Sequence, residues 1–145
     1  MFFLETFDLE VKTTAGTDIL DLTGPVQERV QQTGVTAGLL TLFISGSTAA
    51  LTTIEYESGA VHDLKAAIER LFPQDLEYAH DRRWGDGNGY AHVRAAFLKP
   101  ALSIPIDQGR LQLGSWQQIV LLDFDNRSRQ RQIRGQVLGF TPANG

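Results

Sequence analysis

Segments with the two-residue period of β-strands recur along this sequence, and they constrain its fold more than any other feature. In residues 3–12, Phe3, Phe7, Leu9 and Val11 share one parity, and most residues of the other parity are polar. A strand places alternate side chains on opposite faces, so this pattern predicts a strand with one face buried. Further strands are expected over residues 18–22, 37–44, 48–57, 90–98, 101–106, 117–124 and 130–140, with a short extended segment at Leu111.

Two stretches have the features of helices. Thr23-Gly24-Pro25 combines a capping hydroxyl with an early proline, which predicts a helix start, and Gly34 ends that helix. The second follows Ser58, a residue type that caps helices, and continues with apolar residues at helical spacing until Pro73. Many strands with two main helices predict an α+β fold with mixed or antiparallel sheets, because parallel βαβ winding needs more helices. No linker or repeat interrupts residues 1–145, so we expect a single domain.

Composition narrows the chemistry that is available. The 145 residues are 42% hydrophobic and 21% charged, as in an ordinary globular domain. Cysteine is absent, so disulfides and thiolate metal sites are excluded, and histidines, carboxylates and hydroxyls remain as ligands or nucleophiles. The formal charge of −4 argues against nonspecific nucleic-acid binding, which depends on Lys and Arg. The sequence shows neither a signal-peptide pattern nor an apolar stretch of membrane-spanning length, so a cytoplasmic protein without membrane contact is expected.

The polar stretch 74–89 gathers most of the unusual residues and is predicted to be a site loop. His80 and His92 stand twelve residues apart, which matches neither one helix face nor a zinc signature, so only the fold could bring them together. With Asp86 or Glu55 nearby, they would form a divalent-metal site or an acid/base pair. The alternative is that both histidines are hydrogen-bonding loop residues.

Two segments offer backbone amides to an anion. Gly85-Asp86-Gly87-Asn88-Gly89 could cradle a phosphate, although a flexible hairpin tip would have a similar composition. Ser45-Gly46-Ser47-Thr48 adds hydroxyls at a strand edge and is the second candidate. Gly114 is expected at a close backbone approach. The predicted phosphate-binding residues are Ser47, Thr48, Asp86, Gly87, Asn88 and Gly114.

Other polar and aromatic residues have simpler interpretations. Arg127, Arg129 and Arg131 fall on one parity of an extended segment and are expected on a solvated sheet face. Trp116 is expected to pack in the core. His62 is expected at the surface.

Glu55 closes an apolar strand, where an acid is either solvated at a rim or held in a pocket with a raised pKa. Glu57 shares its parity and is the substitute if Glu55 is structural.

Five stretches that cover nearly the whole chain in order resemble the YjbQ-like, or secondary thiamine-phosphate synthase, family. They are Gly38–Phe43 continuing into Ser47–Ala50, Thr53-Ile54-Glu55, the loop from Tyr78 to His92, Leu113–Gln118, and Asp123–Arg129. The resemblance implies a compact single-domain fold, a homotrimer, and sites at or near subunit contacts lined by histidines and acids, with Glu55 in a pocket. Where most members resemble a His-Thr-Thr pattern, this sequence has Gly46-Ser47-Thr48, so the first histidine of a three-histidine site is absent.

The resemblance implies an enzyme that binds a small phosphorylated metabolite and has a weak transferase activity of the thiamine-phosphate synthase type. Glu55, His80 and His92 would be catalytic, and His80, His92 and Asp86 would hold a divalent metal, Mg²⁺ or Zn²⁺, with no organic cofactor. The alternative is a non-catalytic trimeric protein that binds a metabolite or a metal. Gly46, which removes an imidazole and would enlarge that corner of the site, favours the alternative.

Overall fold

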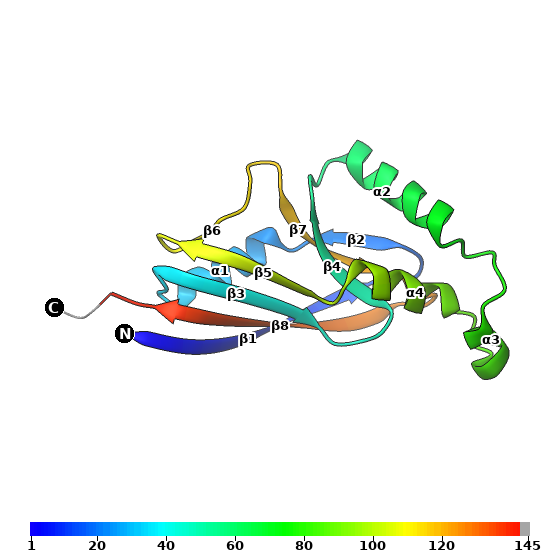
Figure 1. Cartoon of the computed structure of the whole chain (residues 1–145), viewed down its shortest axis with the longest axis horizontal. Helices are drawn as coiled ribbons and strands as arrows, with labels where there is room; N and C mark the ends of the chain where they lie inside the picture. The colour runs from blue at the N-terminus through cyan, green and yellow to red at the C-terminus, as the bar shows by residue number, and fades with distance from the viewer. Residues whose placement is uncertain (143–145) are drawn as a thin grey trace.

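A computed structural model describes residues 1–142, which fold into two antiparallel sheets flanked by helices (Figure 1). The larger sheet has five strands in the spatial order β1 (Phe2–Thr13), β8 (Arg129–Phe140), β3 (Ala37–Ile44), β5 (Ala101–Asp107) and β6 (Arg110–Leu111). The smaller sheet has three, in the order β2 (Asp18–Asp21), β7 (Gln118–Asp123) and β4 (Ala49–Ile54). Every strand pairing in both sheets is antiparallel, so the predicted α+β class with antiparallel sheets is confirmed.

The described residues contain four helices: α1 (Thr23–Gln32), α2 (Ser58–Leu71), α3 (Ala79–Trp84) and α4 (Gly89–Leu98). The first two are the predicted ones. Helix α2 is capped by Glu57, whose carboxylate accepts the amides of Gly59 and Ala60, both at 2.7 Å. These two hydrogen bonds lower the pKa of Glu57. Glu57 is therefore a capping residue, which removes its main qualification as a substitute for Glu55.

The strand predicted over residues 90–98 is wrong, because these residues form α4. Its buried positions include Tyr90, Ala91, Arg94 and Ala95, whose spacing places them on one helical face. The alanines, which favour helix, were the signal that the mixture of aromatic and β-branched residues obscured. Helix α3 was also missed, and it lies inside the stretch that was predicted to be a loop.

Strand β7 is the centre of the molecule. Ile119 and Leu121 pack into the core shared with the five-stranded sheet and α1, whereas Val120 and Leu122 face α4 and α2. The protein thus has three layers, with the small sheet between the large sheet and helices α2 and α4, whereas α1 packs into the core on the large-sheet side. Burial on both faces explains why β7 is a continuous apolar run rather than an alternating one.

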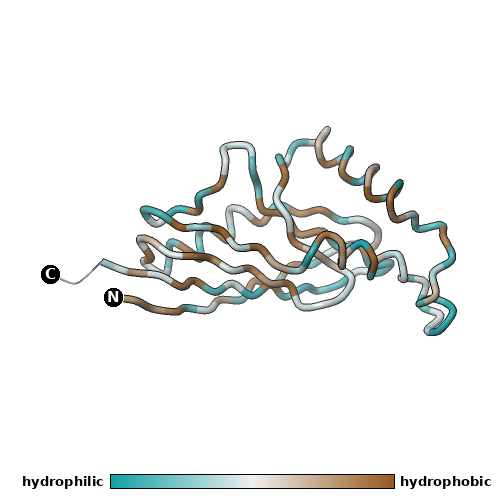
Figure 2. Tube along the Cα trace, viewed as in Figure 1, coloured by the Kyte–Doolittle hydropathy of each residue, from teal (hydrophilic) through white to brown (hydrophobic). Residues whose placement is uncertain are grey.

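Polar residues gather at the end of the molecule that carries α3, which Figure 2 draws mostly in teal. The two termini lie together at the opposite end, where the amino group of Met1 donates to the carbonyl of Thr141 at 3.0 Å (Figure 1). Trp116 precedes β7 and is 75% exposed, so its predicted core position is wrong. His62 is exposed on α2, as expected. No helix within residues 1–142 is long and apolar enough to cross a membrane.

Candidate functional site

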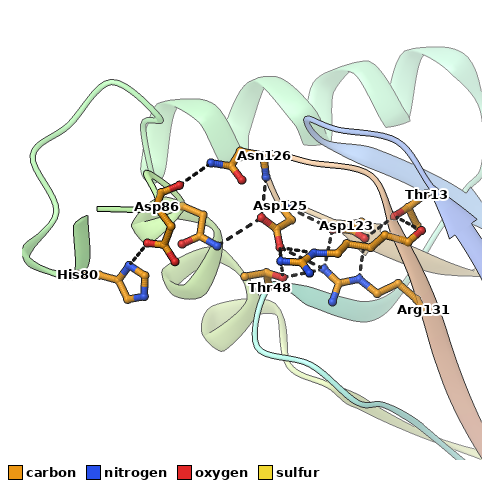
Figure 3. Close-up of polar contacts among 10 residues, drawn as sticks. Thr13, Thr48, His80, Asp86, Asp123, Asp125, Asn126 and Arg131 are labelled. Atoms are coloured by element: carbon orange, nitrogen blue, oxygen red, sulfur yellow. Dashed lines mark hydrogen bonds and ion pairs between the residues drawn. The ribbon is translucent and has the colours of Figure 1, made fainter. Parts of the chain in front are cut away.

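Two buried carboxylates lie where β7 ends, and they organise the polar end of the molecule (Figure 3). Asp123 accepts two hydrogen bonds from Arg131, at 2.7 Å from Nε and 2.9 Å from Nη2, and one from the Thr13 hydroxyl at 2.6 Å. Burial by itself would raise the pKa of Asp123. The hydrogen bonds and the positive charge of Arg131 outweigh burial and lower that pKa below its ordinary value.

Asp125 ties together segments that are distant in the sequence. Its carboxylate accepts the Asn126 amide at 2.8 Å, Asn88 Nδ2 at 3.3 Å, Arg129 Nε at 2.9 Å and the Thr48 hydroxyl at 3.0 Å. Burial opposes ionisation, but these donors together lower the pKa of Asp125 to about 2. Asp125 is therefore charged at neutral pH, and it joins the residue before β4, the residue before α4 and the first residue of β8.

A cavity of about 370 Å³ opens beside these carboxylates. Residues 46–48, which precede β4, form one wall, and the connection from α3 to α4 forms another. Asp125, Arg127, Arg129 and Arg131 line the rest of the cavity. Of the predicted phosphate-binding residues, Ser47, Thr48, Asp86 and Asn88 line this pocket. Gly87 lies between two of them in the chain.

The fold brings His80 and His92 together despite their separation in sequence. Their ring centroids are 4.3 Å apart, with 38° between the ring planes. His80 Nδ1 lies 3.4 Å from a carboxylate oxygen of Asp81 and 3.4 Å from one of Asp86 (Figure 3). His80, Asp81 and Asp86 offer ligand atoms that lie within 4.8 Å of one another. This group contains Asp81, which the sequence did not single out, and it does not contain the predicted ligand His92.

Asp81 was missed because acids beside histidines are common at protein surfaces. Its carboxylate also accepts the amide of Gly89 at 2.8 Å, which fixes α3 against the start of α4. This one side chain therefore contributes both to the polar cluster and to the angle between two helices.

Glu55 and Gly114 do not line this pocket. The close backbone approach predicted for Gly114 is wrong, because a Cβ there would meet only side-chain atoms of Gln117, at 3.6 Å. Glu55 is exposed just beyond the end of β4, whereas Thr48 precedes its start, about 20 Å away at the rise of a strand. Gly114 lies at the same end as Glu55, because its amide donates to Gln117 Oε1 at 3.0 Å while Gln117 Nε2 donates to Thr53 at 3.1 Å. Within one chain, Glu55 is therefore exposed to solvent at the rim of the strand and does not lie in a pocket.

The solvated face predicted for the arginines is wrong for Arg131, which is only 7% exposed. The odd positions of β8, including Ile133 and Val137, face the core, and Arg131 shares that face. These apolar neighbours on the same parity were the signal that sequence reasoning missed. Arg129 is partly buried against Asp125, whereas Arg127 is exposed as predicted.

The glycine-rich connection joins two helices and is not a hairpin tip. Gly85 ends α3 with a φ of 72°, in the left-handed region that favours glycine. A Cβ on Gly89 would lie 2.6 Å from Cβ of Tyr78, so close approach requires glycine there. These two glycines have structural reasons that are independent of any anion.

Comparisons with known proteins agree on one family. The model of the family described as UPF0047 protein YjbQ-like matches residues 7–140. A UPF0047 protein of Archaeoglobus fulgidus is 34% identical over 126 residues, which cover 87% of this chain and 96% of that protein. A UPF0047 protein of Methanothermobacter thermautotrophicus is 31% identical over 139 residues, covering 94% of this chain and 95% of that protein.

Solved structures show the same fold. A hypothetical protein from Aeropyrum pernix K1 superposes with a TM-score of 0.87 at 32% identity, covering 94% of this chain and 99% of that one. A YbjQ-like protein of unknown function from Sulfolobus solfataricus P2 superposes with a TM-score of 0.85 at 26% identity, covering 95% and 100%.

Proposed function

The chain belongs to the UPF0047 protein YjbQ-like family, and on that premise we propose that it is an enzyme whose pocket binds a phosphorylated small molecule beside a divalent cation. One observation carries the proposal. The ligand atoms of His80, Asp81 and Asp86 lie within 4.8 Å of one another, in or beside a pocket that three arginines also line. Cation ligands next to cationic side chains suit a substrate that carries phosphate groups.

The donor set fits a cation of either predicted kind. One imidazole nitrogen and two carboxylates suit Zn²⁺, whereas Mg²⁺ would use the carboxylates together with oxygens of the substrate. A bound cation would neutralise negative charge on a phosphate or pyrophosphate group. The arginines of the pocket would hold that group in position.

The proposed reaction is a transfer of the thiamine-phosphate synthase type, in which pyrophosphate leaves as a pyrimidine is joined to a thiazole phosphate. His80 and His92 line this pocket, and imidazoles are the side chains that most often transfer protons in catalysis. Asp81 and Asp86 each place a carboxylate oxygen 3.4 Å from His80 Nδ1. A catalytic Glu55 would have to come from a second copy of the chain, because its own lies at the far end of β4.

We therefore include a homotrimer in the proposal. Leu4, Leu138 and Leu39 are aligned across three neighbouring strands of the large sheet, and all three are exposed. Phe2 and Phe140 extend this apolar patch with ring centroids 5.3 Å apart, and Figure 2 shows the start of β1 in brown. Burial of such a patch between copies would favour a closed cyclic assembly.

The second candidate is a trimeric protein that binds a metabolite or a metal without turnover. Two observations favour it: Gly46 supplies no imidazole, and Glu55 is distant from the pocket of its own chain.

The deciding experiment is product formation by purified protein from the pyrimidine pyrophosphate and the thiazole phosphate, with and without Mg²⁺. We expect slow, cation-dependent turnover that falls on the order of 100-fold in His80→Ala. Equal rates in the wild type and His80→Ala would assign the product to a contaminant. Ligand binding without product would favour the second candidate.

A further inference from the structure

One donor nitrogen in the pocket has no partner. Arg131 donates through Nε and Nη2 to Asp123, and through Nη2 to the Thr48 hydroxyl at 2.6 Å. Its other terminal nitrogen, Nη1, makes no hydrogen bond to any residue between 1 and 142. Asn88 Oδ1 is the only fully buried side-chain polar atom without a partner in the described part of the chain. Nη1 therefore keeps some exposure to solvent, and it lies beside Gly46 in the lining of the pocket.

Gly46 is the residue that leaves Nη1 uncovered. A Cβ built on Gly46 would lie 2.8 Å from Nη1, which is closer than nonbonded atoms approach, and the φ of this residue is 129°. The guanidinium could not swing aside easily, because hydrogen bonds to Asp123 and Thr48 hold it. The absence of a histidine at Gly46 was expected to enlarge this part of the pocket, and the Arg131 guanidinium borders the space beside Gly46.

The surrounding charges leave this nitrogen available. The carboxylate of Asp125 is occupied by Arg129, Thr48 and Asn88, and that of Asp123 by Arg131 and Thr13. Arg127 lines the same pocket and forms no side-chain ion pair among residues 1–142. The pocket therefore offers an incoming anion a directional donor and an additional positive charge.

We propose that Arg131, uncovered by Gly46, is the anion-binding residue of this pocket, and that it takes a tetrahedral oxyanion such as the terminal phosphate of a phosphate monoester. This inference rests on the proposed function. It assigns the phosphate to Arg131, which belongs neither to the predicted glycine-rich cradle, residues 85–89, nor to the group of cation ligands. A phosphate group suits the pocket better than a carboxylate, because it has more oxygens with which to accept hydrogen bonds from Arg131, Arg127 and Ser47, which all line the pocket.

Calorimetric titration with inorganic phosphate, in buffer that contains EDTA, tests the inference without the cation. Gly46→Ala should weaken phosphate binding at least tenfold, because the new methyl group covers Nη1. Gly34→Ala is the matched control. Gly34 also has a positive φ, of 73°, but a Cβ added there would meet only a methyl group of Thr141 at 4.0 Å. The phosphate affinity of Gly34→Ala should therefore equal that of the wild type.

Equal phosphate affinity in folded Gly46→Ala and wild type would overturn the inference and leave the proposed function standing. No phosphate binding by the wild type, with EDTA or with Mg²⁺, would overturn both. Acetate should bind more weakly than phosphate, and tighter binding of acetate would contradict a tetrahedral ligand.

Because Gly46→Ala could impair folding, a crystal structure of the wild type with phosphate provides an independent measurement. A phosphate oxygen within hydrogen-bond distance of Arg131 Nη1 would support the assignment. Phosphate found only on exposed Arg127, or only as an adventitious ion between molecules, would overturn it.

Discussion

Arg131 and Asp123 form a two-point ion pair that joins the two sheets, since Arg131 belongs to β8 of the large sheet and Asp123 to β7 of the small one. Both residues are buried. The pair thereby fixes one wall of the pocket relative to the carboxylates at the end of β7.

Asp123→Asn should strongly destabilise the protein. The amide keeps the shape of the carboxylate but leaves the buried Arg131 charge with only the more distant carboxylate of Asp125, at 3.9 Å, and breaking a buried pair typically costs about 3–5 kcal/mol. Urea unfolding should show this loss as a lower midpoint. Asp8→Asn is the matched control, because Asp8 binds Arg134 at 2.9 Å on the exposed face and should lose little. Similar midpoints for the two variants would contradict a structural role for the buried pair.

Asp125 should make stability depend on pH under acid conditions. Its folded-state pKa of about 2 lies below the ordinary value of 3.8, so the folded state favours the charged form. The resulting stabilisation is complete above about pH 4 and is lost as the pH falls through 2, a difference of about 2 kcal/mol. Urea unfolding at pH values from 2 to 5 should show stability rising with pH. The slope should be smaller in Asp125→Asn, and an unchanged slope would assign it to other acids.

Removal of His80 should abolish tight binding of Zn²⁺, because the three grouped ligand atoms would become two. Calorimetry on metal-free protein should show affinity at least tenfold weaker in His80→Ala and in Asp86→Asn. His62→Ala is a matched control, since His62 has the same arrangement with its neighbour, at 3.5 Å from Asp63, on an exposed helix face. Undiminished Zn²⁺ binding in His80→Ala with Asp86→Asn would place the cation elsewhere.

Glu55 should act in the pocket of a neighbouring copy if it acts at all. Glu55→Gln and His80→Ala should each be nearly inactive, yet an equal mixture reassembled into trimers should recover up to about a quarter of wild-type activity, because sites with both native residues would form across contacts. Light scattering should report a trimer at micromolar concentration. A monomer, or a mixture no more active than its components, would contradict a shared site.

Much of the fold could be predicted from local patterns. The alternation in residues 3–12 and the start and stop signals near residues 23–34 and 58–73 predicted one strand and two helices that the structure contains, because these patterns depend on near neighbours in sequence. The predicted caps themselves were wrong: Leu22 precedes α1 without a side-chain cap, and Glu57 rather than Ser58 caps α2. Helix α4 was missed because Tyr90 to Leu98 combines helix-forming alanines with residues typical of strands. Its packing against the small sheet decided the outcome.

The sequence by itself determined the family, the α+β class and the set of groups available for chemistry: three histidines, many carboxylates and no thiol. Only the tertiary structure decided which of these groups meet. His80 and His92 converge because two short helices fold against each other, whereas Glu55 is carried away from them because β4 is extended. The environment of Arg131 was likewise decided by which face of β8 lies on the core, since parity groups residues on a face without saying whether that face is buried.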